Sequence, residues 1–104
     1  MIHQNWGELV REHFTNQIPK LPNIGDSVSG EVVACAHAGI WLDIHCGIPA
    51  LLEIIHLDSQ KYNPEEYPEW MPEISERFDA VVVAIEKKEI RLTQNFLFNK
   101  SYSY

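Results

Sequence analysis

The chain has 104 residues, of which 45% are hydrophobic, so it is long enough for one domain with a modest core. Lys and Arg total 8 against 15 Asp and Glu, which gives a formal net charge of −7 and a pI of about 5.1. This balance argues against a broadly basic surface for nucleic acid, because phosphate contacts need cationic side chains. It favours a polypeptide or cationic partner, and it leaves room for a local basic patch.

The first residues contain no basic leader followed by an apolar run, and no stretch approaches the roughly 20 apolar residues that span a bilayer. We therefore expect a cytoplasmic protein that makes no membrane contact. Cys35 and Cys46 both lie in apolar, strand-like sequence. In a reducing compartment they should be free and buried, with a disulfide as the less favoured alternative.

Residues 5–17 have the spacing of one amphipathic helix. Its apolar stripe consists of Trp6, Leu9, Val10 and Phe14. Asn5 followed by Glu8 suits a capping box at the start of the helix. We expect the stripe to pack on the domain that follows, with docking of a partner as the alternative. Two prolines within residues 18–23 should end the helix and give an extended connector.

From Ile24 onwards the hydrophobic period becomes two, which is typical of strands. Residues 27–36 place Val28, Gly30, Val32 and Ala34 on one face. A second alternating run covers residues 40–45, and a third apolar run begins at residue 50. Glycines at positions 39 and 47 suit the two turns between these runs.

Residues 58–77 are polar and rich in proline, which indicates a loop, with a short helix expected around 71–77 and Pro72 in its first turn. Strands are predicted over 78–86 and 89–94, joined by a tight turn at Lys87 and Lys88. Three strands before a long connection and two after it predict a small closed antiparallel barrel.

Residues 24–95 resemble the RNA-binding domain of ribosomal protein S-one, an OB-fold barrel also found at the end of polynucleotide phosphorylase. The matching motifs, in chain order, are Ile24 with Gly25, Gly30 to Val32, Gly39 to Leu42, and Ile90 to Thr93. The resemblance implies an all-β protein, a five-stranded antiparallel OB-fold barrel with an added N-terminal α-helix. The helix and its connector then occupy 1–23, the barrel 24–95, and an aromatic tail 96–104.

Members of that family bind single-stranded RNA on the second and third strands, through stacking rings and cationic side chains. Trp41 matches one of the family's rings, whereas Ala38 stands where the commonest ring is found. Glu53 replaces a usual histidine, Glu89 replaces a basic residue, and the usual acidic Glu86 is kept. The ligand face therefore keeps one stacking group and gains negative charge.

The resemblance implies a nucleic-acid-binding set on this face that is expected to hold single-stranded RNA weakly. Its members are Trp41, His37, Lys87, Lys88 and Arg91. The alternative is a degenerate OB fold that acts as an acidic protein-interaction module, recognising a basic protein or ribonucleoprotein surface. A third possibility is an acidic mimic of nucleic acid that blocks a basic site.

Two aromatic features leave alternatives open. Trp41 is either an exposed stacking ring or a half-buried ring covered by the N-terminal helix or the long loop. Tyr67 and Trp70 lie among glutamates and either pin the loop to the barrel or dock a basic partner. Both interpretations predict that Trp70 is at least partly buried.

The sequence offers no recognisable catalytic or cofactor motif, so we expect neither an enzyme nor a cofactor. Four residues of zinc-ligand type surround the first turn, namely Cys35, His37, His45 and Cys46. If residue 35 lies across from about residue 42, these side chains are too spread out to converge on one metal ion. Asp43 and Glu53 share a predicted face, where they would form a solvated acidic patch.

Overall fold

A computed structural model of the chain describes residues 2–95, so the tail expected at 96–104 lies outside the described residues. The described part has one α-helix, α1 (Trp6–His13). Its strands are β1 (Ser27–Cys35), β2 (Gly39–Asp43), β3 (Ala50–Glu53), β4 (Arg77–Ile85) and β5 (Ile90–Thr93). Two short 3-10 helices, η1 (Ile54–His56) and η2 (Pro64–Glu66), lie in the long connection between β3 and β4. No helix within residues 2–95 is long and apolar enough to cross a membrane.

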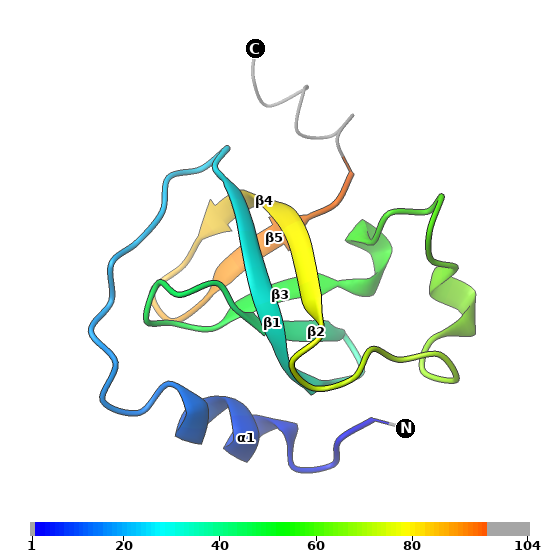
Figure 1. The fold of residues 1–104 in the computed structure, drawn as a ribbon, viewed down its shortest axis with the longest axis horizontal. Coiled ribbons are helices and arrows are strands. Elements are labelled where there is room, and N and C mark those ends of the chain that lie inside the picture. Colours follow the sequence, from blue (N-terminus) through cyan, green and yellow to red (C-terminus); the bar gives the residue numbers. More distant parts are fainter. Residues whose placement is uncertain (1, 96–104) are drawn as a thin grey trace.

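The strands close into a barrel in the order β1-β2-β3-β5-β4, as Figure 1 shows. This confirms the predicted five-stranded OB-fold barrel. Four of its pairings are antiparallel, and β3 with β5 is parallel. A closed ring with an odd number of strands cannot alternate in direction all the way around. One parallel pair is therefore required, which the prediction of a fully antiparallel barrel overlooked.

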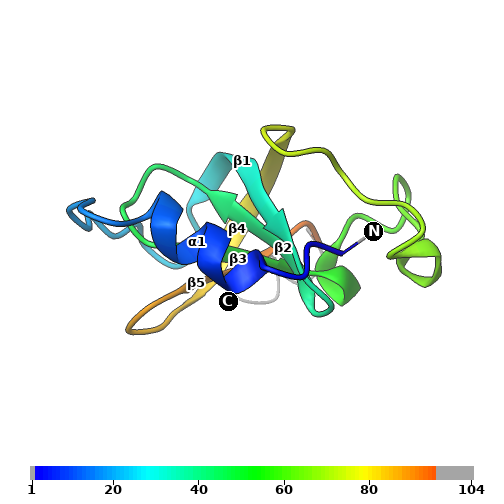
Figure 2. The ribbon, with the colours of Figure 1, turned by 90° about the horizontal axis from the view of Figure 1, so that it is seen from below.

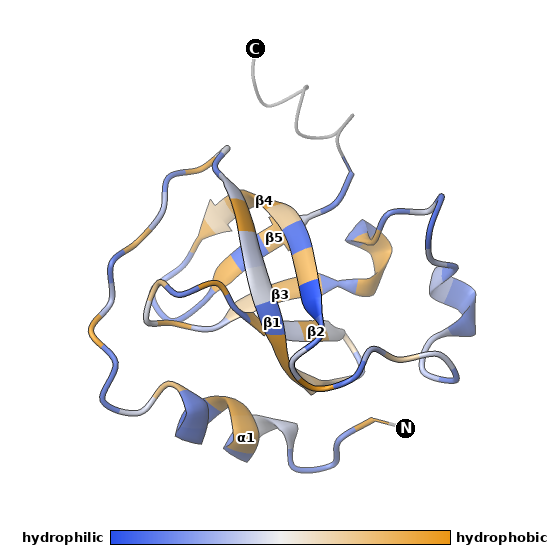
Figure 3. Cartoon of the chain, viewed as in Figure 1, coloured by the Kyte–Doolittle hydropathy of each residue, from blue (hydrophilic) through white to orange (hydrophobic). Residues whose placement is uncertain are grey.

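The interior of the barrel is filled by apolar side chains from every strand. The largest of the fully buried aliphatic ones are Ile40, Leu42, Leu52, Ile90 and Leu92. Figure 3 shows apolar and polar positions following one another along the strands. That alternation is what buries one face of each strand. Cys35 and Cys46 are free and buried, as predicted.

A β-bulge reverses the expected alternation near the end of β1. The pairing of β1 with β2 shifts register between Val32 and Ala34. Ala34 was predicted on the inner face, but it joins Val33 in a separate outer cluster, while Cys35 takes the next interior position. The extra residue of a bulge changes the side to which later side chains point, and alternation alone does not show where it falls.

The helix is shorter than the predicted 5–17. Helical geometry ends at His13, and Asn16 adopts a left-handed conformation with φ of 67°. Asn5 makes no capping hydrogen bond, so the expected capping box with Glu8 is absent. The reason is local, because Asn5 has φ −99° and ψ 27° rather than the extended conformation in which a cap side chain reaches the next amides.

The apolar side of α1 packs on the outside of the barrel, as predicted. Val10 is buried against Val33 and Ala34 of β1, and Trp6 packs against Trp41 of β2. Figure 2 shows α1 lying across the barrel, where its contacts are with β1 and with Trp41 of β2. The helix therefore covers part of the face that the family resemblance assigns to RNA.

The long loop is held to the barrel by its rings. Tyr62 stacks on Trp70 with centroids 4.7 Å apart and contacts Phe78 of β4. The Tyr67 hydroxyl donates a hydrogen bond to the carbonyl of Ala36. Trp70 is half-buried, as predicted.

The helical turn expected at 71–77 is absent, and the loop forms η2 at Pro64–Glu66 instead. There Asn63 accepts a hydrogen bond from the amide of Glu65, which caps that turn. The proline that opens the helical turn is therefore Pro64, whose preceding asparagine can cap it, rather than Pro72.

Candidate nucleic-acid interface

An aromatic ring and a guanidinium lie in one row on the outer face of the barrel. Strand register pairs Trp41 with Leu51, and Leu51 with Arg91. The residues on either side of each in sequence point into the core, so all three point outward. Trp41 and Arg91 are separated by two strand spacings, roughly 10 Å. The row therefore combines a stacking group and a cation, the two chemistries that single-stranded nucleic acid requires.

The ring of Trp41 is covered by the helix. Its centroid lies 5.8 Å from that of Trp6, and the two indole planes differ by 11°, so the rings are stacked. Trp41 and Trp6 are both half-buried. Of the two alternatives left by the sequence, the half-buried ring covered by the N-terminal helix is the one observed.

The cation of the row is paired with carboxylates. Arg91 contacts Glu53 at 2.9 Å and Glu89 at 2.9 Å, and Glu86 lies 4.0 Å away. Burial opposes the charge of Arg91, but the neighbouring carboxylates, Glu89 first, outweigh burial and raise its pKa. A phosphate that approaches this guanidinium competes with Glu53 and Glu89 for it. The two glutamates expected only to repel phosphate are thus also ion-pair partners of Arg91.

The other predicted interface residues lie at two ends of this face. His37 is exposed in the turn between β1 and β2, which lies at the Glu53 end of β3 because Gly39 pairs with Glu53. Lys87 and Lys88 are exposed in the turn before β5, which begins beside Ala50 at the other end of β3. The five predicted residues therefore do not form one compact site.

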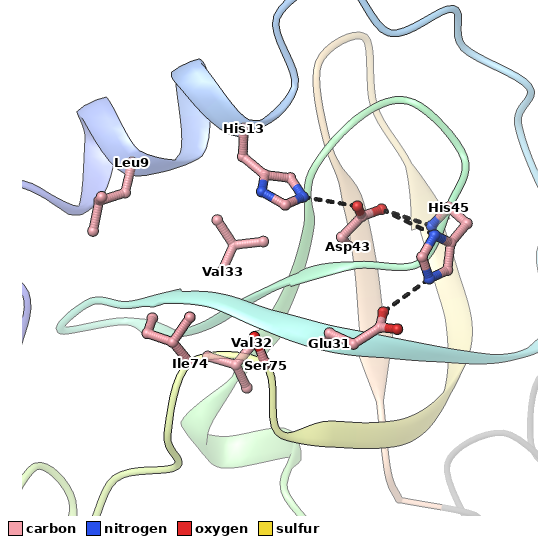
Figure 4. A pocket seen from close by; sticks show the side chains of 9 residues that line it. All are labelled: Leu9, His13, Glu31, Val32, Val33, Asp43, His45, Ile74 and Ser75. Carbon is pink, nitrogen blue, oxygen red and sulfur yellow. Dashed lines mark hydrogen bonds and ion pairs between the residues drawn. The ribbon is translucent and has the colours of Figure 1, made fainter.

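A polar cluster that the sequence did not predict joins α1 to the barrel. His13 Nε2 lies 2.8 Å from Asp43 Oδ2, and the backbone amide of His45 donates to Asp43 Oδ1 at 2.8 Å. His45 Nε2 in turn lies 2.8 Å from Glu31 Oε2. Figure 4 shows these side chains at one end of an open hollow of about 460 Å³, with Leu9, Val33 and Ile74 at the other. His13 lies within the predicted helix 5–17, and nothing in its spacing pointed to Asp43.

Asp43 is a buried carboxylate rather than part of an exposed acidic patch. Burial alone would raise its pKa, but the hydrogen bonds from His13 and from the His45 amide outweigh burial and lower the pKa below its usual value. The expectation that it neighbours Glu53 is wrong. Glu53 pairs with Gly39 at the start of β2, whereas Asp43 is the last residue of that strand.

Three of the four residues of zinc-ligand type make separate contacts, and His37 is exposed in the turn between β1 and β2. The Cys35 thiol donates to the carbonyl of Pro72, the Cys46 thiol donates to that of Ile48, and His45 pairs with Glu31. Among residues 2–95 no three His, Cys, Asp or Glu side chains gather in a way that could hold a metal ion. The register differs from the expected one, since residue 35 lies opposite Ile40 rather than residue 42.

Comparison with solved structures shows the fold of this chain. GSP13 from Bacillus subtilis is 14% identical with a TM-score of 0.61, and the match covers 78% of this chain and 62% of that one. A putative exosome complex RNA-binding protein is 23% identical with a TM-score of 0.57, over 75% and 46%. RNase R from Mycoplasma genitalium is 20% identical with a TM-score of 0.53, over 67% and 13%.

The match therefore spans less than two thirds of each of these three structures. No family model and no curated protein matches the chain. At these identities the likeness establishes the fold alone. The protein has the five-stranded OB-fold barrel that its sequence predicted, with α1 packed on the outside.

Proposed function

We propose that the chain is a non-catalytic module that binds single-stranded RNA weakly on the outer face of β2, β3 and β5. The observation that carries this proposal is the outward row of Trp41, Leu51 and Arg91 on an S-one-type OB fold. Two of the structural neighbours bear names that refer to RNA, an exosome complex RNA-binding protein and an RNase. These names support the ligand class, and the row supports the location.

The chemistry of this face favours stacking over phosphate capture. Stacking of one base on one ring contributes about 1–3 kcal/mol in comparable single-strand binders. The electrostatic contribution is small here, since Arg91 is already paired with Glu53 and Glu89 and the chain carries a net charge of −7. Exposed Lys87 and Lys88 are then the cations that add attraction for the backbone. Weak binding with little dependence on salt follows from this distribution.

A second candidate function is supported by the acidic side of the same molecule. The loop between β3 and β4 carries exposed carboxylates at Glu65, Glu66, Glu69, Glu73 and Glu76. Such a surface complements a basic protein or ribonucleoprotein surface. In this alternative the OB fold is a degenerate, acidic protein-interaction module, and α1 permanently closes the nucleic-acid face.

A titration with two probes tests both functions. Fluorescence anisotropy of labelled hexauridylate at about 20 mM salt should show saturable binding, because charges are least screened there. An octa-lysine peptide provides the probe for the acidic candidate. Absence of RNA binding at low salt, together with peptide binding that Glu65→Gln and Glu66→Gln weaken, would replace the first function by the second.

A further inference from the structure

A hollow of about 450 Å³ lies where three distant segments of the chain meet. Its lining residues are Ile2, His3, Gln4, Trp6, His37 and Pro68. They come from the start of the chain, the turn between β1 and β2, and the long loop. We propose that this hollow receives one unpaired base of a single-stranded RNA, stacked on the indole of Trp6. This inference rests on the proposed function and names the place where the base binds.

The ring geometry leaves part of Trp6 for a ligand. Trp41 is stacked on one face of the Trp6 indole, with an interplanar angle of 11°. Trp41 is not among the residues that line the hollow, whereas Trp6 is. The hollow is thus bounded by a part of Trp6 that Trp41 does not cover, and a base lying flat on that part of the indole would add a third ring to the two indoles. Trp6 supplies from outside the barrel the second ring that Ala38 lacks.

The hollow is held in shape before a ligand arrives. The His3 amide donates to the Cys35 carbonyl at 3.1 Å, and the Cys35 amide donates to His3 Nδ1 at 2.9 Å. The Trp6 amide then donates to the His3 carbonyl at 3.1 Å. These bonds tie the segment before α1 to the end of β1, so little conformational freedom remains to be lost on binding.

The hydrogen bond to His3 Nδ1 also determines which hydrogen-bonding group His3 presents to the hollow. Because Nδ1 of His3 accepts a hydrogen bond from the backbone, the neutral imidazole carries its proton on Nε2. His3 therefore offers an N–H donor, beside the exposed amide of Gln4 and the exposed imidazole of His37. Donors and acceptors around an aromatic floor match a base, which has a flat face and polar edges. An apolar side chain of a protein would contact the ring but would make no use of these polar groups.

The hollow also differs in charge from the surroundings of Arg91. None of its six lining residues carries a carboxylate, whereas Glu53 and Glu89 hold the guanidinium of Arg91. A nucleic acid can therefore approach this hollow without displacing a paired acid. In a chain with a net charge of −7, a hollow without carboxylates opposes the phosphate backbone of RNA less than the acidic surroundings of Arg91 do.

Nuclear magnetic resonance of the full chain during titration with hexauridylate tests the proposal. The indole N–H signal of Trp6 and the backbone amides of His3 and His37 should shift together and saturate. The indole of Trp70 is the internal control, since it is stacked on Tyr62 in the long loop. Trp6→Leu, which keeps an apolar cover over Trp41, should weaken binding at least about fivefold, the lower end for loss of one stacking ring. Trp6→Phe should restore most of it.

A second variant separates loss of the ligand contact from loss of helix packing, because Trp6→Leu can change both. Gln4 and His37 are exposed, so Gln4→Ala with His37→Ala should leave α1 docked and still weaken hexauridylate binding measurably. Shifts confined to Lys87 and Lys88 would overturn the hollow as the site and leave the proposed function standing. No shift anywhere at low salt would remove the proposed function as well. A Trp6 shift with N-acetyltryptophanamide but none with hexauridylate would overturn the base in favour of a protein side chain.

Discussion

The outer face of the barrel has an aromatic half and an ionic half. The side chains of the aromatic half stack on each other, and those of the ionic half form ion pairs. In the aromatic half, Trp6 and Trp41 are stacked on each other, and a hollow remains open beside Trp6. In the ionic half, Arg91 is enclosed by Glu53 and Glu89. A flat ring can accept a further ring on its free side, but a guanidinium that already holds two carboxylates has little capacity left for phosphate.

In the proposed function, this difference separates base stacking from phosphate capture. Loss of phosphate contacts removes most of the salt-dependent affinity, and stacking is affected much less because it depends on ring area. The two halves can therefore be altered separately.

The largest expected effect comes from the contact that places both halves on one sheet. A Cβ at Gly39 would lie 2.4 Å from the Leu52 carbonyl oxygen and 2.8 Å from the Glu53 Cα. Gly39→Ala should thus push β3 away from β2 and lower the free energy of unfolding by about 1–3 kcal/mol, as overpacking does. Urea unfolding measures this. Gly7→Ala in α1 is the control, since a Cβ there meets nothing within 4 Å, and an equal loss in both variants would contradict the account.

The next effect concerns the polar cluster that joins α1 to the barrel in the aromatic half. Asp43→Asn removes the charge that His13 and the His45 amide stabilise, and should destabilise the fold by about 1–3 kcal/mol at pH 7. Because the folded-state pKa of Asp43 is lowered, its contribution is present above the usual carboxyl value of about 3.9 and is lost as pH falls below it.

Unfolding experiments at pH 7 and pH 3 separate this effect from general acid sensitivity. The wild-type chain should lose more stability between these two values than Asp43→Asn does. His13, His45 and Glu31 also face the cluster, so His13→Gln, which keeps a hydrogen-bond donor, is the matched control. The same pH dependence in wild type and Asp43→Asn would show that the carboxylate is not stabilised as described.

The ionic half should gain function when its acids are neutralised. Glu53→Gln together with Glu89→Gln leaves Arg91 free to contact phosphate. Binding of hexauridylate at low salt should tighten several-fold, and its dependence on salt should steepen by about 0.7 in the logarithmic slope for each added phosphate contact. The single variant Glu65→Gln, in the loop, changes charge without freeing Arg91 and is the control. An equal gain in the control would attribute the effect to net charge alone.

The smallest expected effect is at the exposed turn before β5. Lys87→Ala with Lys88→Ala removes two solvent-exposed cations at the end of the face farthest from His37. Affinity for hexauridylate should fall less than about threefold at physiological salt, where a screened surface charge contributes little. A larger loss, measured by the same anisotropy titration, would mean that the lysines rather than the rings dominate binding.

The sequence was sufficient for the barrel, because alternation, turn glycines and the order of the motifs specify five strands and their connections. The sequence was insufficient to predict the β-bulge, where one extra residue changes the side to which the following side chains point. The bulge at Val33 moves Ala34 outward and Cys35 inward, and no local signal distinguishes it from regular alternation. The parallel pairing of β3 with β5 follows from closing a ring of five strands.

The site was harder to predict because its contacts join segments far apart in the chain. Trp6 and Trp41 were both recognised as aromatic positions, but only the docking of α1 stacks them. Glu53 and Glu89 were recognised as replacements of usual ligand residues. Their pairing with Arg91 required the register of β5 beside β3. The kinds of side chain at the site were thus predictable from the sequence, whereas the residues that each of them contacts were not.

The salt dependence of hexauridylate binding tests the central claim most directly, because it separates stacking from phosphate capture. The account predicts saturable binding with a logarithmic salt slope between 0 and about −1.4, which corresponds to at most two phosphate contacts. A slope steeper than about −3 would show that cations dominate. Either a slope this steep or a failure to bind at low salt would contradict an aromatic face that binds single strands.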